Sequence, residues 1–236
     1  IGLLLGGILK GQELINSAKV KNLANDFRTI PTYIYAYQDK FKALPGDDNA
    51  VATHLGASGT AATVGAVGNG VIESDPLSAT ATNESFLFWQ HVRLANLAAG
   101  PTATGDADYR PKNAVGGYIG IASLVNTGAM ANAKITLPTT MSGTYQICSE
   151  SILGKFAKQL DTQMDDGNTQ TGSMRAAAMT LTTTAVATSS IDDATPYLIG
   201  GGATARVTSG EHPTALPAPT WAAGAARHEG GSPNVI

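Results

Sequence analysis

IGLLLGGILKGQELINSAKVKNLANDFRTIPTYIYAYQDKFKA, residues 1–43, is the stretch on which the fold depends. In its second part, large apolar residues recur every three or four positions, the spacing that places side chains on one face of a helix. These residues are Val20, Leu23, Phe27, Ile30, Ile34, Tyr37 and Phe41. Because such a stripe needs a partner surface along its length, it predicts a long amphipathic helix packed on the rest of the chain.

The opening run from Ile1 to Leu9 is of a different kind. It has no charged residue and no polar face, which is typical of a helix in lipid or in a protein core. Nine residues cannot span a bilayer, which takes about 20. Because the sequence begins with Ile1 rather than Met, we expect about ten further apolar residues upstream that complete a span. The alternative is a buried helix end.

Two features interrupt this helix. Pro31 lies within the amphipathic stripe, but the stripe keeps its phase, so we predict a kink or curve within one helix rather than a break. Four glycines, Gly2, Gly6, Gly7 and Gly11, crowd the start. They form two G-x-x-x-G spacings, which let helices approach closely in lipid.

This arrangement resembles a known family. The run IGLLLGGILKG, followed by NSAKVKNLANDFRTIPTYIYAYQDKF and the turn ALPGDD, is similar to the amino-terminal half of a type IV pilin or pilin-like protein over residues 1–48. FLFWQHVRLANL and GKFAKQLDTQMDDGNTQTGSMRA resemble the family more loosely. The family's basic leader, cleavage-site Gly, methylated Phe and nearby Glu do not occur here, so we expect about a dozen residues of the mature start upstream of Ile1. The lone Cys148 departs from the disulfide-closed loop of many pilins.

The resemblance implies a structural subunit of an extracellular filament on the bacterial cell surface. Such a subunit is anchored in the inner membrane before assembly, is handled by an export and assembly machinery, and polymerises into a helical homo-oligomer. The implied assembly residues are Ile1, Leu3, Leu4, Leu5, Ile8 and Leu9, with Gly2, Gly6, Gly7 and Gly11 giving close packing and letting the helix loosen in a filament. One alternative is a minor pilin or a type II secretion pseudopilin. Another is a membrane-tethered extracytoplasmic binding domain.

The predicted fold class is α+β, a long N-terminal helix packed on an antiparallel sheet. We expect the helix over residues 1–43, with an apolar assembly part over about 1–15 and an amphipathic part over about 16–43, and a globular head over 44–236. In the head we predict further helices at 83–97 and 150–165, and strands at 117–124, 133–137, 144–148 and within 174–187. Residues 49–83 are predicted to form a long surface connection, and the chain beyond residue 189 an irregular extension.

Composition narrows the range of functions that the chain could have. Charged residues make up 14% of the chain, against about 25% in average proteins. This favours a protein that packs among copies of itself or lies outside a cell. The net charge is −3 and no stretch combines Lys and Arg with aromatic residues, so nucleic-acid binding is not indicated. The single cysteine, Cys148, is predicted to be a buried structural thiol.

Motifs for catalysis and cofactor binding are missing. The sequence contains no G-x-S-x-G, H-E-x-x-H or G-x-G-x-x-G motif. Its four histidines, His54, His91, His212 and His228, are scattered, and His91 with Arg93 is predicted to form a polar helix face. We therefore expect no enzyme activity, catalytic residues or cofactor.

One acidic group near the predicted third helix is a candidate calcium site. It consists of Asp161, Asp165, Asp166 and Asn168. The EF-hand pattern fails, because the sixth position from Asp161 is Asp166 instead of Gly and the twelfth is Gly172 instead of Glu. Acids at a helix end beside a Gly turn are common, so the sequence favours no metal site.

Overall fold

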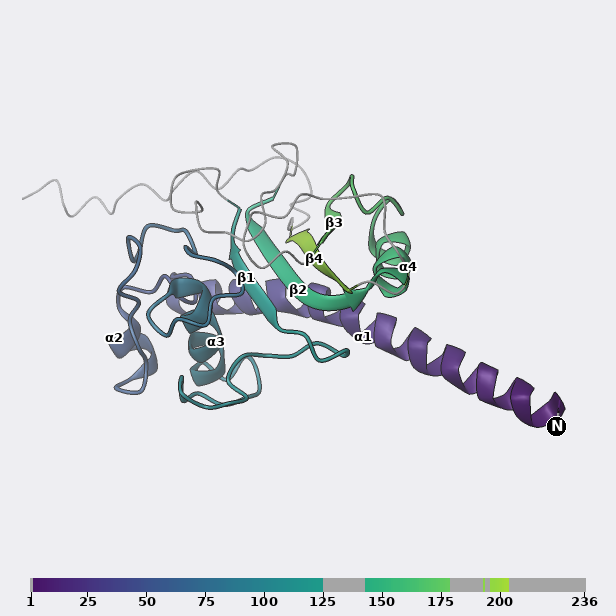
Figure 1. Cartoon of the computed structure of the whole chain (residues 1–236). Helices are drawn as coiled ribbons and strands as arrows, with labels where there is room; N and C mark the ends of the chain where they lie inside the picture. Colours follow the sequence, from purple (N-terminus) through teal and green to yellow (C-terminus); the bar gives the residue numbers. More distant parts are fainter. Residues whose placement is uncertain (1, 125–142, 179–192, 194–195, 204–236) are drawn as a thin grey trace, which may run out of the picture. The chain divides into compact units, whose positions relative to one another are not determined.

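The computed structural model of the chain describes residues 2–124, 143–178, 193 and 196–203. In chain order its elements are α1 (Gly2–Phe41), α2 (Val51–Leu55), α3 (Glu84–Leu94), β1 (Ile119–Ser123), β2 (Tyr145–Leu153), α4 (Gly154–Met164), β3 (Met174–Ala178) and β4 (Pro196–Ala203) (Figure 1). The long first helix and the antiparallel sheet confirm the α+β class. The chain divides into units Ile1–Ala205 and Arg206–Ile236, and every described residue belongs to the first.

The first helix is continuous. α1 runs through Pro31 without a break, as the unbroken phase of the apolar stripe predicted. Pro31 leaves the carbonyl of Phe27 without its usual helical donor, yet the flanking Phe27, Ile30 and Ile34 are all buried. Packing on this face therefore holds the helix through the proline.

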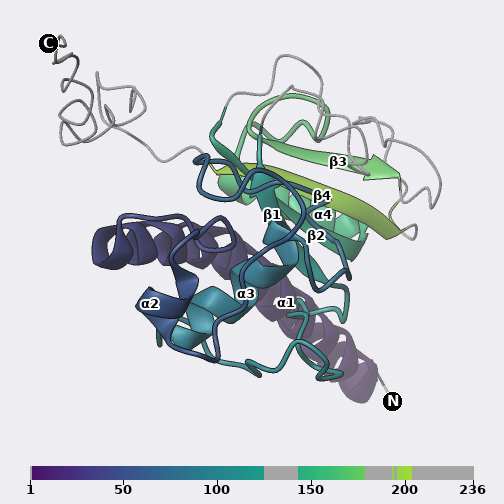
Figure 2. The same ribbon diagram turned by 90° about the vertical axis from the view of Figure 1, so that its left-hand side faces the viewer.

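The second half of α1 lies against a single apolar core. The core joins its stripe to residues of α3, α4 and the sheet, including Phe88, Ile121, Ile147, Phe156 and Ile199. α1 packs directly against α4 and β4. Figure 2 shows α1, α3 and α4 on one side of the sheet. The predicted cover of the sheet by the first helix is thus shared among three helices.

The sheet has the strand order β1-β2-β4-β3 with antiparallel pairing throughout. Strands predicted at 117–124 and 144–148 correspond to β1 and β2, and the start of the stretch 174–187 forms β3. The expectation of an irregular chain beyond residue 189 is wrong for Pro196–Ala203, because β4 pairs with β2 on one side and β3 on the other. The predicted strand at 133–137, residues 179–187 and the Pro-rich tail lie outside the described residues.

The predicted helix over 150–165 begins too early. Residues up to Leu153 continue β2, because Ile152 is fully buried and pairs with Tyr197 of β4. α4 then starts at Gly154 and has no side-chain cap at its N-terminus. Sequence spacing could not separate the end of the strand from the helix, since Leu153, Phe156 and Leu160 suit one helical face.

The connection over residues 49–83 is more than a surface loop. It contains α2, and its backbone runs beside β1, where Ser123 N donates to Ile72 O (2.8 Å) and Ile72 N donates to Ser123 Oγ (2.8 Å). Leu77 packs on Cys148. The prediction of a buried thiol at Cys148 is confirmed, and burial raises its pKa well above the ordinary value.

α3 is buried on all sides, from Glu84 to Arg93. The predicted polar face at His91 and Arg93 is therefore wrong. Nη1 of Arg93 donates to Tyr109 O (2.6 Å) and Pro101 O (2.9 Å). These carbonyls satisfy Nη1 of the buried guanidinium, whereas its Nε has no hydrogen-bond partner in the described chain. Sequence spacing could not reveal these carbonyls.

His91 connects two loops. Its Nδ1 accepts from Gly46 N (2.9 Å), so its Nε2 carries the proton and donates to Thr60 O (2.8 Å). Burial lowers the pKa of His91, which agrees with a neutral ring. Gly46 has a φ of +92° and lies against the backbone of Glu84, so a side chain here would be strained and would also clash.

Two acidic side chains meet beside this turn. Asp47 accepts N–H bonds from Gly68 and from Gly70 (2.7 Å), and Glu84 accepts from Glu73 N (2.7 Å). Burial raises the pKa of Glu84 to about 8, and the nearby charges of Asp47 and Glu73 act in the same direction. Glu84 is therefore protonated at neutral pH in the folded chain.

We predict that Glu84→Gln reduces the pH dependence of stability. The ordinary pKa of this carboxyl is 4.5 and its folded value is about 8. Between these values the unfolded chain releases a proton that the folded chain keeps, so the free energy of unfolding falls as pH rises. The amide mimics the protonated acid, so the variant should match the parent below pH 4.5 and exceed it by at least about 1 kcal/mol at pH 8.5.

Urea unfolding across this pH range measures the effect. Glu13→Gln, which changes an exposed acid on α1, is the matched control and should follow the parent curve. Parallel curves for the parent and Glu84→Gln would show that Glu84 is charged in the folded chain.

Candidate functional site

α1 changes character between Ile15 and Val20. From Val20 to Tyr37 its stripe is buried, whereas every residue from Gly6 to Lys10 is exposed. Four large apolar residues in the first half keep more than half of their surface exposed, and we call them the apolar end of α1: Ile8 (54%), Leu9 (61%), Leu14 (64%) and Ile15 (58%). Figure 1 shows this half of the helix, in purple, running out beyond the sheet. An exposed apolar surface on an anchored helix indicates an interaction site.

The predicted assembly residues overlap this surface in part. Ile8 and Leu9 belong to it. The others lie outside the described residues, Ile1 entirely and Leu3, Leu4 and Leu5 in their side chains. The list of predicted residues stopped at Leu9 and missed Leu14 and Ile15. The available signal was spacing, because Ile15 follows Ile8 by seven positions and so shares its face of the helix.

The predicted packing residues occupy the other half of α1. Six are buried in the core: Val20, Leu23, Phe27, Ile30, Ile34 and Tyr37. Phe41 is half-buried at the end of the helix, where its ring stacks on that of His54 with centroids 5.0 Å apart. The division of the helix into an exposed and a core-packed half therefore falls a few residues beyond the predicted boundary at about residue 15.

The glycines of the first half have open space around them. A Cβ added at Gly6, Gly7 or Gly11 would meet no heavy atom within 4 Å in the described chain. Because alanine would fit at these positions, packing within the described chain does not explain the glycines. Each glycine also costs a helix about 1 kcal/mol relative to Ala. Gly7 and Gly11, four positions apart, would let the backbone of another helix approach closely.

A surface groove of about 480 Å³ lies between α1 and α4, next to the apolar end. Its lining combines polar side chains with apolar surface and consists of Lys10, Glu13, Leu14, Asn16, Ser17, Val20, Lys21, Gln159 and Gln163. The ion pair of Lys10 Nζ with Glu13 Oε2 spans 2.9 Å and is largely exposed, so it adds little stability. The apolar end thus adjoins side chains that can hydrogen-bond to a partner.

Comparison with known proteins gives no relative. No family model matches the chain, and no similar curated protein or solved structure was found. Among the described residues, no helix combines the length and the apolar content needed to cross a membrane.

The described histidines have structural partners. His54 Nδ1 lies 2.7 Å from Asp48 Oδ2, which also accepts from Tyr37 Oη (2.7 Å). Burial alone would raise the pKa of Asp48, but the hydrogen bonds from His54, Tyr37 and Ala50 N outweigh it and lower the pKa. This network fixes the end of α1 to the following loop. His212 and His228 lie outside the described residues.

We predict that two isoleucines of α1 respond differently to the same truncation. Ile30→Ala should reduce the free energy of unfolding by about 2–5 kcal/mol, because it opens a cavity in the core. Ile8→Ala should change it by less than about 0.5 kcal/mol, because Ile8 is exposed in the single chain. Chemical denaturation of the monomeric protein measures both. Equal losses would mean that Ile8 is packed inside the chain's own core.

Proposed function

We propose that this chain is a structural subunit of a type IV pilus-like extracellular filament, in which the apolar end of α1 packs among other copies of the chain. The observation that supports this most is the division of α1. One half is anchored in the core, and the other half presents Ile8, Leu9, Leu14 and Ile15 to solvent. Burying these side chains in a neighbour would remove an unfavourable exposed surface.

Energetics favour assembly through this surface. Burial of a Leu or Ile side chain contributes about 1.5–3 kcal/mol, so four such residues offset much of the entropic cost of association. A helix that inserts among neighbours makes contact with surfaces different from its own. Such heterologous contacts, repeated without closing into a ring, build a helical fibre.

The open glycines support a helix-to-helix contact. A Cβ added at Gly7 or Gly11 would meet no heavy atom within 4 Å in the described chain, and small residues four apart bring two helix backbones close together. A simple tether would not need this close contact. In the proposed assembly the same segment resides in the inner membrane until the subunit joins the filament.

We predict that Ile8→Asp prevents filament formation. A carboxylate buried among apolar side chains carries a large desolvation penalty, whereas the exposed position should leave the fold of the single chain intact. The experiment is made in the cells that produce the protein, with the full-length gene. Electron microscopy and quantification of the sheared surface fraction measure filaments, and total cellular protein controls for expression.

Val64→Asp is the matched control, because Val64 is an exposed apolar residue (45%) far from the apolar end in sequence. It should give filaments in normal amounts. Normal filaments from Ile8→Asp would refute the role of the apolar end. If the parent chain forms no filament and residues 1–20 prove dispensable for its activity, the tethered binding domain replaces this proposal.

A further inference from the structure

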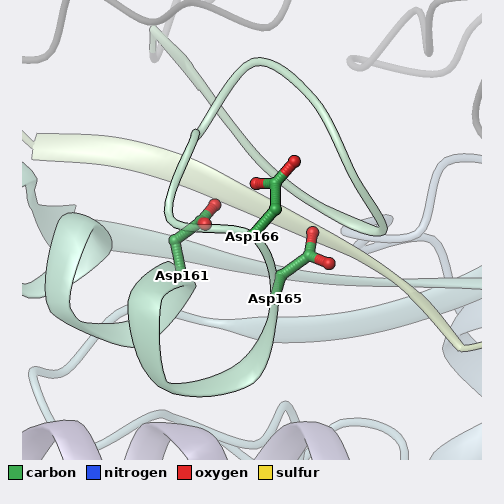
Figure 3. A group of neighbouring side chains, drawn as sticks. All are labelled: Asp161, Asp165 and Asp166. Atoms are coloured by element: carbon green, nitrogen blue, oxygen red, sulfur yellow. The ribbon is translucent and has the colours of Figure 1, made fainter.

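Three aspartates converge where α4 ends. Asp161 lies in the last turn of the helix, and Asp165 and Asp166 directly follow it. Each offers a carboxylate oxygen, and these oxygens lie within 4.8 Å of one another. Figure 3 shows the carboxylates of Asp161 and Asp166 directed toward the same space beneath the loop that follows α4.

Asp161 is the unusual member of this cluster. It is fully buried, and neither of its carboxylate oxygens has a hydrogen-bond partner. Burial and the neighbouring charges of Asp165 and Asp166 raise its pKa, and the nearby Gly167 N–H opposes this rise. A buried carboxylate without a partner is costly, so such groups are normally paired or bound to a metal.

Within the described residues, the cations of the chain do not provide that partner. No described Lys, Arg or His forms an ion pair with any of the three aspartates. Arg175, which lies nearby, uses its Nε to donate to Gly172 O (3.2 Å). Within the described chain the three carboxylates thus have no ion-pair partner, and the charge of Arg175 acts on Asp166 without forming an ion pair with it.

The other two carboxylates are held in place by the loop. Asp166 accepts from Asn168 N (2.8 Å) and Thr171 Oγ1 (2.6 Å), and Asp165 Oδ2 accepts from Met174 N (2.7 Å). Each of these oxygens has a second lone pair, and within the described chain the hydrogen bond to Asp165 uses Oδ2 rather than Oδ1. The loop therefore holds these two carboxylates in place and leaves lone pairs on their oxygens that can bind a cation.

The loop approaches these acids closely. Gly172 has a φ of +70°, and a Cβ at this position would overlap the carboxylate of Asp165. A glycine is required here both by the backbone conformation and by the lack of space. The loop after α4 thus brings its backbone, with further carbonyl oxygens, next to the three carboxylates.

We propose that Asp161, Asp165 and Asp166 bind a Ca²⁺ ion at the end of α4. All the available donors are oxygens, which suit a hard cation, and no sulfur or imidazole donor belongs to the cluster. Ca²⁺ accepts six to eight oxygens in flexible geometries, so loop carbonyls and water can complete its shell. Mg²⁺ demands regular octahedral geometry and releases its water reluctantly, so it fits three closely spaced carboxylates less well.

This site is independent of the proposed filament. It uses no residue of the apolar end, so either proposal can fail without the other. The sequence argued against an EF-hand, and that conclusion stands, because the spacing of these ligands differs from the EF-hand loop. The burial of Asp161 without a partner is the observation that the sequence could not provide.

Calorimetric titration of the chelator-treated chain with CaCl₂ at pH 7.5 tests the proposal. We expect one saturable site with a Kd below about 1 mM, and a melting temperature that rises with Ca²⁺ concentration because the ion binds the folded state. Asp161→Asn should weaken binding at least tenfold. Because the amide removes a buried charge, this variant should fold at least as well as the calcium-free parent.

Asp108→Asn is the matched control. Asp108 is an exposed acid paired with Lys112, and its loss should leave the Kd and the melting shift unchanged. Absence of both heat and a melting shift at 10 mM CaCl₂ would overturn the proposal. Undiminished binding by Asp161→Asn would do so as well, since it would place the ion elsewhere. A response to MgCl₂ without one to CaCl₂ would overturn the assignment of the metal.

Discussion

The contact between the second half of α1 and the rest of the unit is the interaction on which the structure depends. Three helices lie on one side of a four-stranded sheet, and a single apolar core joins them. Because α1 packs against both α4 and β4, its stripe joins parts of the chain that are more than 150 positions apart. The same rigid helix extends beyond the core. Its first half is therefore held in place by packing that occurs elsewhere in the molecule.

Buried polar groups complete this packing, and most of them are satisfied. His91 links the turn at Gly46 to Thr60, Asp48 ties Tyr37 to His54, and Asp47 accepts the backbone N–H groups of a Gly-rich loop. In each case the hydrogen bonds offset the loss of hydration that burial imposes. Side chains that suggest chemistry in the sequence thus prove to hold loops in place. Asp161 and Gln146 differ, since both polar side-chain atoms of each are buried without a hydrogen-bond partner in the described chain.

The sequence predicted the elements that show a regular spacing of apolar residues. It missed the features that depend on contacts with residues far away in the sequence. The stripe from Val20 to Tyr37 is visible at once, because helical spacing is a local property. β4 was missed because its glycines, Gly200–Gly202, carry no side chain whose alternation could signal a strand, and only pairing with β2 and β3 places them in the sheet. The buried state of His91 depends on Gly46 and Thr60, which lie 45 and 31 positions away. Leu14 and Ile15 are exposed because the core ends before it reaches them. Local spacing in the sequence does not reveal where the core ends.

α4 connects the two proposals physically. One side of this helix packs on α1, Gln159 and Gln163 line the groove beside the apolar end, and its last turn carries Asp161. A cation bound to Asp161 and to the loop that leads into β3 would join the end of α4 to the sheet. It would also supply the buried carboxylate of Asp161 with a partner. Because α1 packs against α4, restricting the motion of the end of α4 would also restrict the motion of α1. Cation binding would therefore stabilise the platform from which the apolar end extends, without touching the surface that makes the proposed assembly contact.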